Sequence, residues 1–83
     1  MDRRQVLKVA RLRKSLEDGS AVAIRQRFGL SFAEAARGGG VSEAAVLRWE
    51  NGERTPHGAA AARYMDFLDA LERTAHPQPE RAS

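Results

Sequence analysis

The sequence predicts an all-α domain, and three observations lead to this expectation. Apolar residues recur at helical spacing, no stretch alternates as a half-buried strand would, and glycine and proline divide the 83-residue chain into short segments. The expected core is small, because alanine supplies 15 residues whereas Leu, Ile, Val and Phe together supply 16. The formal net charge of +3 is too low to favour disorder.

Composition also excludes several classes of protein. Without cysteine, the chain has no disulfide, no zinc–thiolate site and no thiol nucleophile. The longest apolar run, residues 59–62, is far shorter than the roughly 20 residues that cross a bilayer. The N-terminal residues also lack the apolar segment of a secretory signal. We therefore expect a cytoplasmic protein without a membrane partner.

Residues 2–17 predict a basic amphipathic helix. One stripe of this helix is apolar and is expected to be buried; it comprises Val6, Val9, Leu12 and Leu16. The opposite face carries the basic residues Arg4, Lys8 and Arg11. Residues 1–27 hold eight Lys or Arg against three acids, a net charge of +5, whereas the rest of the chain has a net charge of −2. Such a basic surface suits a polyanion such as nucleic acid, and a solvated helix face is the alternative.

The next two expected helices are short. Ser20 is placed to cap a helix over residues 21–28. Ser31 and Glu34 then have the spacing of a capping box, which starts another helix. The three glycines at positions 38–40 are expected to end that helix at about residue 37.

Two further helices complete the expected fold. Ser42 can cap a helix over residues 42–51, which a glycine ends. Pro56 is suited to start the last helix. The apolar stripe of that helix consists of Ala61, Tyr64, Met65, Phe67, Leu68 and Leu71. Two prolines among polar neighbours predict that the chain after this helix is frayed.

The pair of helices around the glycine turn is the most specific feature of the sequence. Two short helices joined by such a turn have the layout of a helix-turn-helix, whose second helix enters the major groove of DNA. The segment IRQRFGLSFAEAARGGGVSEAAVLRWENGERTP, from Ile24 to Pro56, resembles the lambda-repressor-like, Cro-type (xenobiotic-response-element) helix-turn-helix family. The resemblance extends to about Glu72.

This resemblance implies an all-α, lambda-repressor-like helix-turn-helix domain of four to five short helices, with an extra N-terminal helix. We therefore expect the basic amphipathic helix over residues 1–19, the helix-turn-helix domain over residues 20–73 and a disordered tail over residues 74–83. The N-terminal helix has no counterpart in the minimal family domain. It is interpreted as an added core layer, a dimer contact or a DNA arm.

The resemblance also implies a core and an ion pair. The positions that the family packs inward are Ile24, Leu30, Ala35, Val41, Val46 and Trp49. Trp49 is accordingly expected in the core rather than stacked on a base. Arg25 and Glu50 occupy the positions of a structural ion pair that ties an early helix to the end of the DNA-reading helix. A catalytic role for Glu50 is the alternative, and the sequence offers it no partner.

By resemblance, the residues that reach base edges come from the helix over residues 42–51. They are Ser42, Glu43, Ala44, Ala45, Leu47 and Arg48. An arginine can donate two hydrogen bonds to guanine, a glutamate can accept one from cytosine, and alanine offers only a methyl contact, for example to thymine. Glu43 is alternatively an acid that stabilises the helix start, and Arg48 a solvated surface residue.

Contacts with the DNA backbone are expected from three places. The resemblance implies Ser31, Phe32, Asn51 and Arg54. The basic N-terminal face adds Arg4, Lys8 and Arg11. Phe32 replaces a glutamine that is common in the family, and Asn51 is alternatively only a helix cap.

The first helix of the motif departs from the family in its small residues. Ala35 replaces the usual leucine, and Gly39 replaces a buried aliphatic residue. We therefore expect this helix to be underpacked, so that Gly39→Ala or Gly39→Val raises the melting temperature.

The sequence therefore predicts a non-enzymatic, sequence-specific regulator of transcription that binds double-stranded operator DNA and represses by occlusion. No cofactor or metal is expected, because His57 and His76 are isolated and the glycine run lacks the features of a phosphate loop. We expect a homodimer, since one helix reads only a few base pairs, and a cytoplasmic, nucleoid-associated location. The alternative is an antitoxin that autoregulates its operon and neutralises a partner toxin protein.

Overall fold

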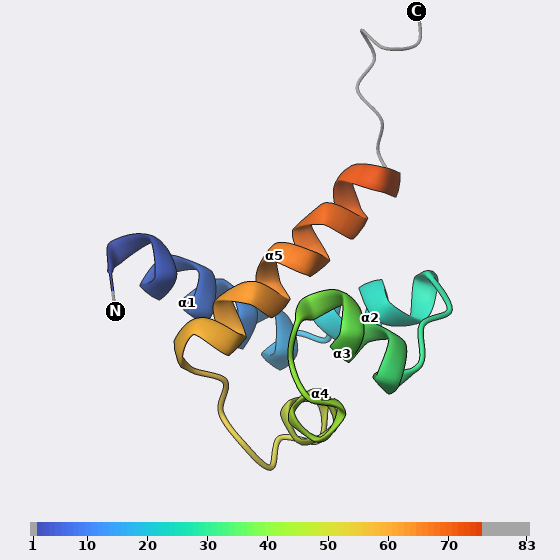
Figure 1. The fold of residues 1–83 in the computed structure, drawn as a ribbon, viewed down its shortest axis with the longest axis horizontal. Coiled ribbons are helices and arrows are strands. Elements are labelled where there is room, and N and C mark those ends of the chain that lie inside the picture. Colours follow the sequence, from blue (N-terminus) through green and yellow to red (C-terminus); the bar gives the residue numbers. More distant parts are fainter. Residues whose placement is uncertain (1, 76–83) are drawn as a thin grey trace, which may run out of the picture.

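Five helices make up the fold in the computed structural model, which describes residues 2–75, and this part of the chain contains no strand. The helices are α1 (Arg3–Glu17), α2 (Ser20–Arg27), α3 (Phe32–Gly39), α4 (Glu43–Glu50) and α5 (Gly58–Ala75) (Figure 1). The all-α prediction is therefore confirmed. Most of the expected tail, together with His76, lies outside the described residues.

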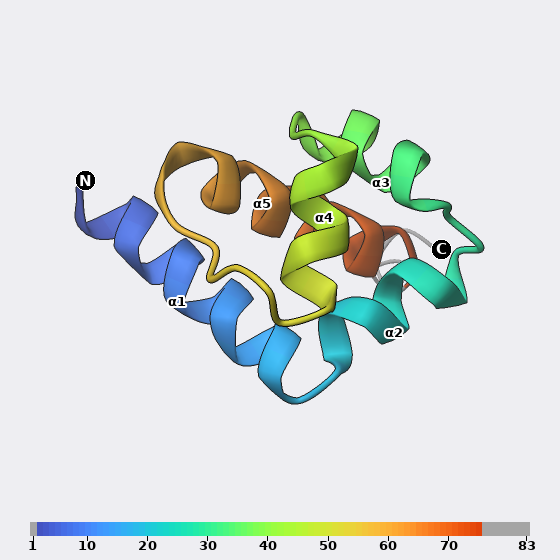
Figure 2. The ribbon, with the colours of Figure 1, turned by 90° about the horizontal axis from the view of Figure 1, so that it is seen from below.

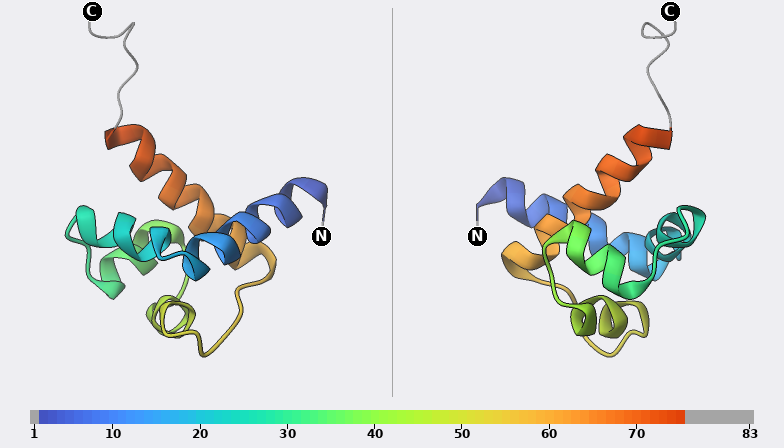
Figure 3. Two further views of the ribbon diagram at one scale, coloured as in Figure 1. Left: turned by 180° about the vertical axis from the view of Figure 1, so that it is seen from behind. Right: turned by 45° about the vertical axis from the view of Figure 1, so that its right-hand side comes forward.

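The helices are arranged around a crossing of α1 and α5. α1 packs against α2 and α5, and α3 packs against α4 and α5. α4 lies below the other helices in the view of Figure 1, on the side away from the C-terminal half of α5, and the turned views of Figure 3 agree. This arrangement leaves one side of α4 without a helix packed on it.

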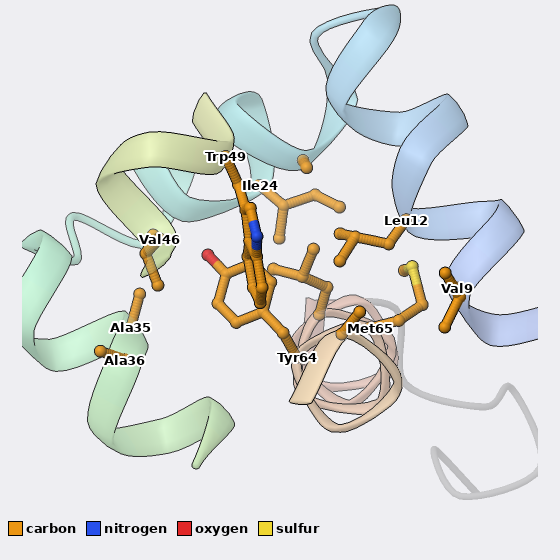
Figure 4. Packing of buried hydrophobic residues seen from close by; sticks show 12 residues of the cluster. Val9, Leu12, Ile24, Ala35, Ala36, Val46, Trp49, Tyr64 and Met65 are labelled. Carbon is orange, nitrogen blue, oxygen red and sulfur yellow. The ribbon is translucent and has the colours of Figure 1, made fainter. Parts of the chain in front are cut away.

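All five helices contribute to one hydrophobic core (Figure 4). Its buried residues are Val9, Leu12, Ala21, Ile24, Ala35, Ala36, Val46, Trp49, Ala61, Tyr64, Met65 and Leu68. Trp49 is buried as expected, and the centroid of its ring lies 5.7 Å from that of Tyr64. α4 is thus anchored to α5 through a pair of aromatic rings.

Two of the expected helix caps are present. The Ser31 hydroxyl accepts a hydrogen bond from the Glu34 N–H, and the Glu34 carboxylate accepts one from the Ser31 N–H, which completes a capping box. The Ser42 hydroxyl accepts a hydrogen bond from the Ala45 N–H at 3.0 Å. These side chains satisfy N–H groups that a helix start leaves without intrahelical partners, so they fix where α3 and α4 begin.

Two expected helix starts differ from the structure. Ser20 lies inside α2, because Gly19 adopts a left-handed backbone (φ 85°) as the N-cap and the Asp18 carboxylate accepts the Ser20 N–H. Pro56 precedes α5, which begins at Gly58. Pro56 is instead buried, and its carbonyl accepts a hydrogen bond from Arg13 of α1.

The apolar stripe expected on α1 is only partly buried. Val9 and Leu12 are almost fully buried and Leu16 is half-buried, but Val6 is 45% exposed. The expectation for Val6 was wrong because the N-terminal end of α1 extends beyond the start of α5, as Figures 1 and 2 show. Since Val9 and Leu12 belong to the common core, α1 packs together with residues 20–73.

The interpretation of Gly39 as a packing defect was also wrong. α3 continues through Gly39, and Gly40 ends it in a left-handed conformation (φ 67°). A Cβ atom added to Gly39 would lie 2.6 Å from Cδ1 of Tyr64 and 3.4 Å from its Cα. The missing side chain is therefore what lets α3 approach α5, and the space that a larger residue would fill is occupied by the Tyr64 ring.

Candidate nucleic-acid interface

The exposed face of α4 carries most of the residues that were expected to read bases. Val46 and Trp49 point from one side of α4 into the core, whereas the side chains on its opposite side are exposed. The exposed residues are Ser42, Glu43, Ala44, Leu47 and Arg48. Seen from below in Figure 2, α4 lies in front of the other helices. One side of this helix is therefore available to a macromolecular partner, and the other is fixed in the core.

Ala45 differs from the other expected base-reading residues. It is half-buried and packs against the core cluster, and its N–H is held by the Ser42 hydroxyl. Its methyl group is thus turned partly into the protein, so we leave Ala45 out of the candidate surface. Ser42 itself is exposed and combines capping with a hydroxyl hydrogen that it can still donate.

Arg48 and Glu43 supply the polar chemistry of this face. Neither side chain forms a hydrogen bond or ion pair with another described residue. The guanidinium of Arg48 therefore keeps all five donors available, which is the requirement for a bidentate contact with guanine. Glu43 lies in the first turn of α4, where a negative charge also stabilises the helix.

An ion pair fixes the C-terminal end of α4. Arg25 donates from Nε to Oε2 of Glu50 at 2.6 Å and from Nη2 to Oε1 at 2.8 Å. The remaining Nη1 donates to the Leu30 carbonyl at 2.8 Å, which ties the turn before α3 to the same guanidinium. The hydrogen bonds that Arg25 donates to Glu50 raise the pKa of Arg25, so its guanidinium stays charged. The pair therefore joins α2 to the last residue of α4.

The expected backbone contacts at the start of α3 are changed by packing. The ring of Phe32 is half-buried, with the Arg25 guanidinium 4.5 Å from its centroid. The Phe32 ring thus packs against the guanidinium of the ion pair, and its contact with the DNA backbone stays a prediction. At Ser31 the capping box places the Glu34 carboxylate against the helix start, and the hydrogen bond from the Ser31 N–H lowers the pKa of Glu34. Ser31 is exposed, but a phosphate there would meet this negative charge.

The segment after α4 contains an exposed cation, Arg54, close to the end of this helix. Asn51 ends the helix, and its side-chain amide donates to the Glu53 carboxylate at 3.3 Å. Arg54 is exposed and has no hydrogen-bond or ion-pair partner among the described residues. A groove of about 380 Å³ separates Arg54 and Trp49 from Arg13 and Leu16 of α1.

Two residues of the basic face of α1 form ion pairs with α5. The Lys8 ammonium lies 2.8 Å from an Asp66 oxygen and 2.7 Å from an Asp69 oxygen, and Arg11 donates twice to Asp69 at 2.9 Å. These bonds hold α1 to α5 and occupy both cations within the protein, and their contact with phosphates stays a prediction. Arg4 is exposed near the N-terminal end of α1, has no partner among the described residues and stays a prediction.

Sequence reasoning missed two arginines that hold the segments on either side of α4. Arg63 of α5 donates from Nε to the Gly40 carbonyl at 3.2 Å, in the turn before α4. Arg13 of α1 donates from Nε to the Pro56 carbonyl at 2.8 Å, in the segment after it. Both bonds join residues far apart in the chain and end on a main-chain oxygen, so no residue pattern indicates them.

Comparison with known proteins gives one match. A family model described as a helix-turn-helix domain matches residues 5–76, which begins inside α1 and is consistent with the Cro-type resemblance. Neither the curated proteins nor the solved structures gave a match. Within the described residues, no helix is long and apolar enough to cross a membrane, and no group of three His, Asp or Glu side chains could hold a metal ion. Since the match covers most of the chain, including every element around α4, the protein belongs to the helix-turn-helix domain family.

Proposed function

We propose that this protein is a sequence-specific, double-stranded DNA-binding regulator of transcription that places α4 in the major groove of an operator. The helix-turn-helix family makes it a DNA-binding regulator in the general sense. The observation that carries the proposal is that one side of α4 is buried in the core while the other is exposed. Its core side buries Val46 and Trp49, while its outer side presents Arg48 with an unpaired guanidinium.

In this proposal, Arg48 reads a guanine, and Glu43 accepts from a cytosine or stabilises the helix start. Ala44 and Leu47 provide apolar contacts with thymine methyl groups. Asn51 and Arg54 lie at the end of α4, where a main chain and a cation can meet the phosphates that border the groove. Repression follows from occupation of the operator, and no cofactor takes part.

We further propose that the active form is a homodimer in the cytoplasm. α4 is only eight residues long, Glu43–Glu50, which limits one protomer to a few base pairs. Two half-sites about one helical turn of DNA apart would multiply the discrimination.

A second candidate function is an antitoxin, and one observation favours it. Val6 and Leu7 are 45% and 55% exposed at the N-terminal end of α1. An apolar surface there suits a protein partner and has no use in phosphate contact. Val6→Glu together with Leu7→Glu should then abolish binding to a toxin encoded beside this gene and leave DNA binding intact.

Selection from random double-stranded DNA tests the proposed function. The full chain is incubated with the pool at moderate salt, bound DNA is amplified, and recovered sites are titrated against scrambled DNA over a range of salt concentrations. We expect one enriched motif with two related half-sites, and an affinity that falls steeply with salt. Recovery of DNA without an enriched motif would contradict sequence-specific readout by α4.

A further inference from the structure

The segment that joins α4 to α5 is held to the rest of the protein at very few points. The Glu53 N–H donates to the Arg48 carbonyl, which closes the turn at the end of α4. Beyond it, no backbone hydrogen bond joins residues 54–56 to the described part of the fold. Arg54 and Thr55 are exposed, and Pro56 is buried. The conformation of this segment therefore depends on what holds Pro56.

Arg13 supplies that contact. Its Nε donates to the Pro56 carbonyl at 2.8 Å in a partly buried hydrogen bond. A cationic donor makes this bond stronger than one between neutral groups. Arg13 is also well fixed itself, because its helix α1 is buried through Val9 and Leu12 immediately before it. The bond thus joins a rigid helix to a carbonyl two residues after Arg54.

We infer that Arg13 is a positioning residue for DNA binding, which holds residues 54–56 so that Arg54 meets a phosphate at the end of α4. The inference rests on the proposed function for its DNA part. Arg13 and Arg54 line the same groove beside the end of α4, so the hydrogen bond acts at the place where the phosphate contact is proposed. Fixing the segment before DNA arrives reduces the ordering that binding would otherwise require.

The claim that Arg13 holds residues 54–56 in the free protein is tested by limited proteolysis with trypsin. Cleavage between Arg54 and Thr55 is followed by mass spectrometry in the wild type, in Arg13→Gln and in Arg3→Gln, which removes the same charge at the other end of α1. We expect Arg13→Gln to speed this cleavage about fivefold, as expected for the loss of one net hydrogen bond, and Arg3→Gln to leave it unchanged. Equal cleavage rates in all three proteins would overturn the inference, whatever the protein binds.

The part that concerns DNA is tested by a double-mutant cycle on the selected site. Arg13→Gln should weaken binding about fivefold in the wild-type background. It should have almost no effect once Arg54→Gln is present, because Arg13 acts through Arg54. An equal loss in both backgrounds would show that Arg13 contacts DNA directly or acts on the whole fold, and would overturn the positioning role. Melting curves show that each variant is folded at the temperature used, and Arg13→Met, which keeps the apolar stem but has no donor, replaces Arg13→Gln if the latter does not fold.

The two tests separate the inference from the proposed function. If the wild-type protein selects no DNA sequence, the proposed function fails, and the proteolysis result still decides whether Arg13 holds residues 54–56.

Discussion

Arg25 and Glu50 form a bidentate ion pair that joins α2 to the last residue of α4. The two side chains are only 11% and 8% exposed, so the protein shields most of this pair from solvent. Because Glu50 immediately follows Trp49, the pair and the aromatic contact with Tyr64 together fix the end of α4. The exposed residues of α4 can then act from a rigid helix.

Breaking this pair on one side should destabilise the fold strongly. Glu50→Gln leaves the Arg25 charge without its counter-ion in a poorly solvated place, and we expect a loss of about 3 kcal/mol in the free energy of unfolding. Urea titration measures this value. Arg25→Met combined with Glu50→Leu removes both charges and should be more stable than Glu50→Gln alone. A loss below about 0.5 kcal/mol in Glu50→Gln, typical of exposed pairs, would show that the pair is effectively solvated.

Gly39→Ala should lower the melting temperature. The new Cβ atom would lie 2.6 Å from Cδ1 of Tyr64, a ring that is 1% exposed and has little room to move. Overpacking of this kind costs about 1–3 kcal/mol, which exceeds the gain of about 1 kcal/mol in helix propensity. Thermal melts should therefore shift down by several degrees.

The variant Tyr64→Leu distinguishes the clash between the new Cβ atom and the Tyr64 ring from other effects of Gly39→Ala. In Tyr64→Leu the ring is absent, so adding Gly39→Ala to that variant should cost less than adding it to the wild type. A higher melting temperature for Gly39→Ala in the wild-type background would contradict the close approach of α3 to Tyr64 of α5.

Acid should weaken the contact between α1 and α5. Burial acts to raise the pKa of Asp69, but hydrogen bonds from Arg11 and Lys8 outweigh it, and the folded protein lowers this pKa. The resulting stabilisation is present above the unfolded pKa of about 3.9 and is lost as the pH falls through the lower folded value. Asp69→Asn should thus be less stable at pH 7 by about 1 kcal/mol and should lose less stability on acidification.

Urea titrations from pH 7 to pH 2 measure this difference. Asp66→Asn is the matched control, because Asp66 is 63% exposed and its pair with Lys8 is expected to contribute less. Parallel pH profiles of the wild type and Asp69→Asn would contradict the role of Asp69.

Local patterns in the sequence were sufficient for most of the helices. The capping residues Ser31 and Ser42 act within three residues of their own helix starts, and Gly52 after α4 has the left-handed backbone expected of a glycine that ends a helix. The inward position of Trp49 followed from the family resemblance, which supplied the register of the motif.

Long-range partners could not be predicted in the same way. Lys8 and Arg11 were interpreted as a free basic face because Asp66 and Asp69, which pair with them, come about 60 residues later in the chain. The positions of these acids depend on how α1 and α5 cross. Gly39 was interpreted as a packing defect because the sequence alone does not show that the Tyr64 ring fills the space beside it. Arg13 and Arg63 were overlooked because each binds a carbonyl oxygen, which every residue possesses.

The base preference of the protein at its selected DNA site tests the central claim most directly. Affinities of the wild type, Arg48→Ala and Arg54→Ala are measured for the site and for each of its single-base variants. We expect Arg48→Ala to lose about 1–3 kcal/mol of discrimination at one base pair in each half-site. Arg54→Ala should weaken binding to all the sequences alike and reduce the slope of log K against log salt by about 0.9. Loss of base preference in Arg54→Ala, with preference intact in Arg48→Ala, would contradict the placement of α4 in the major groove.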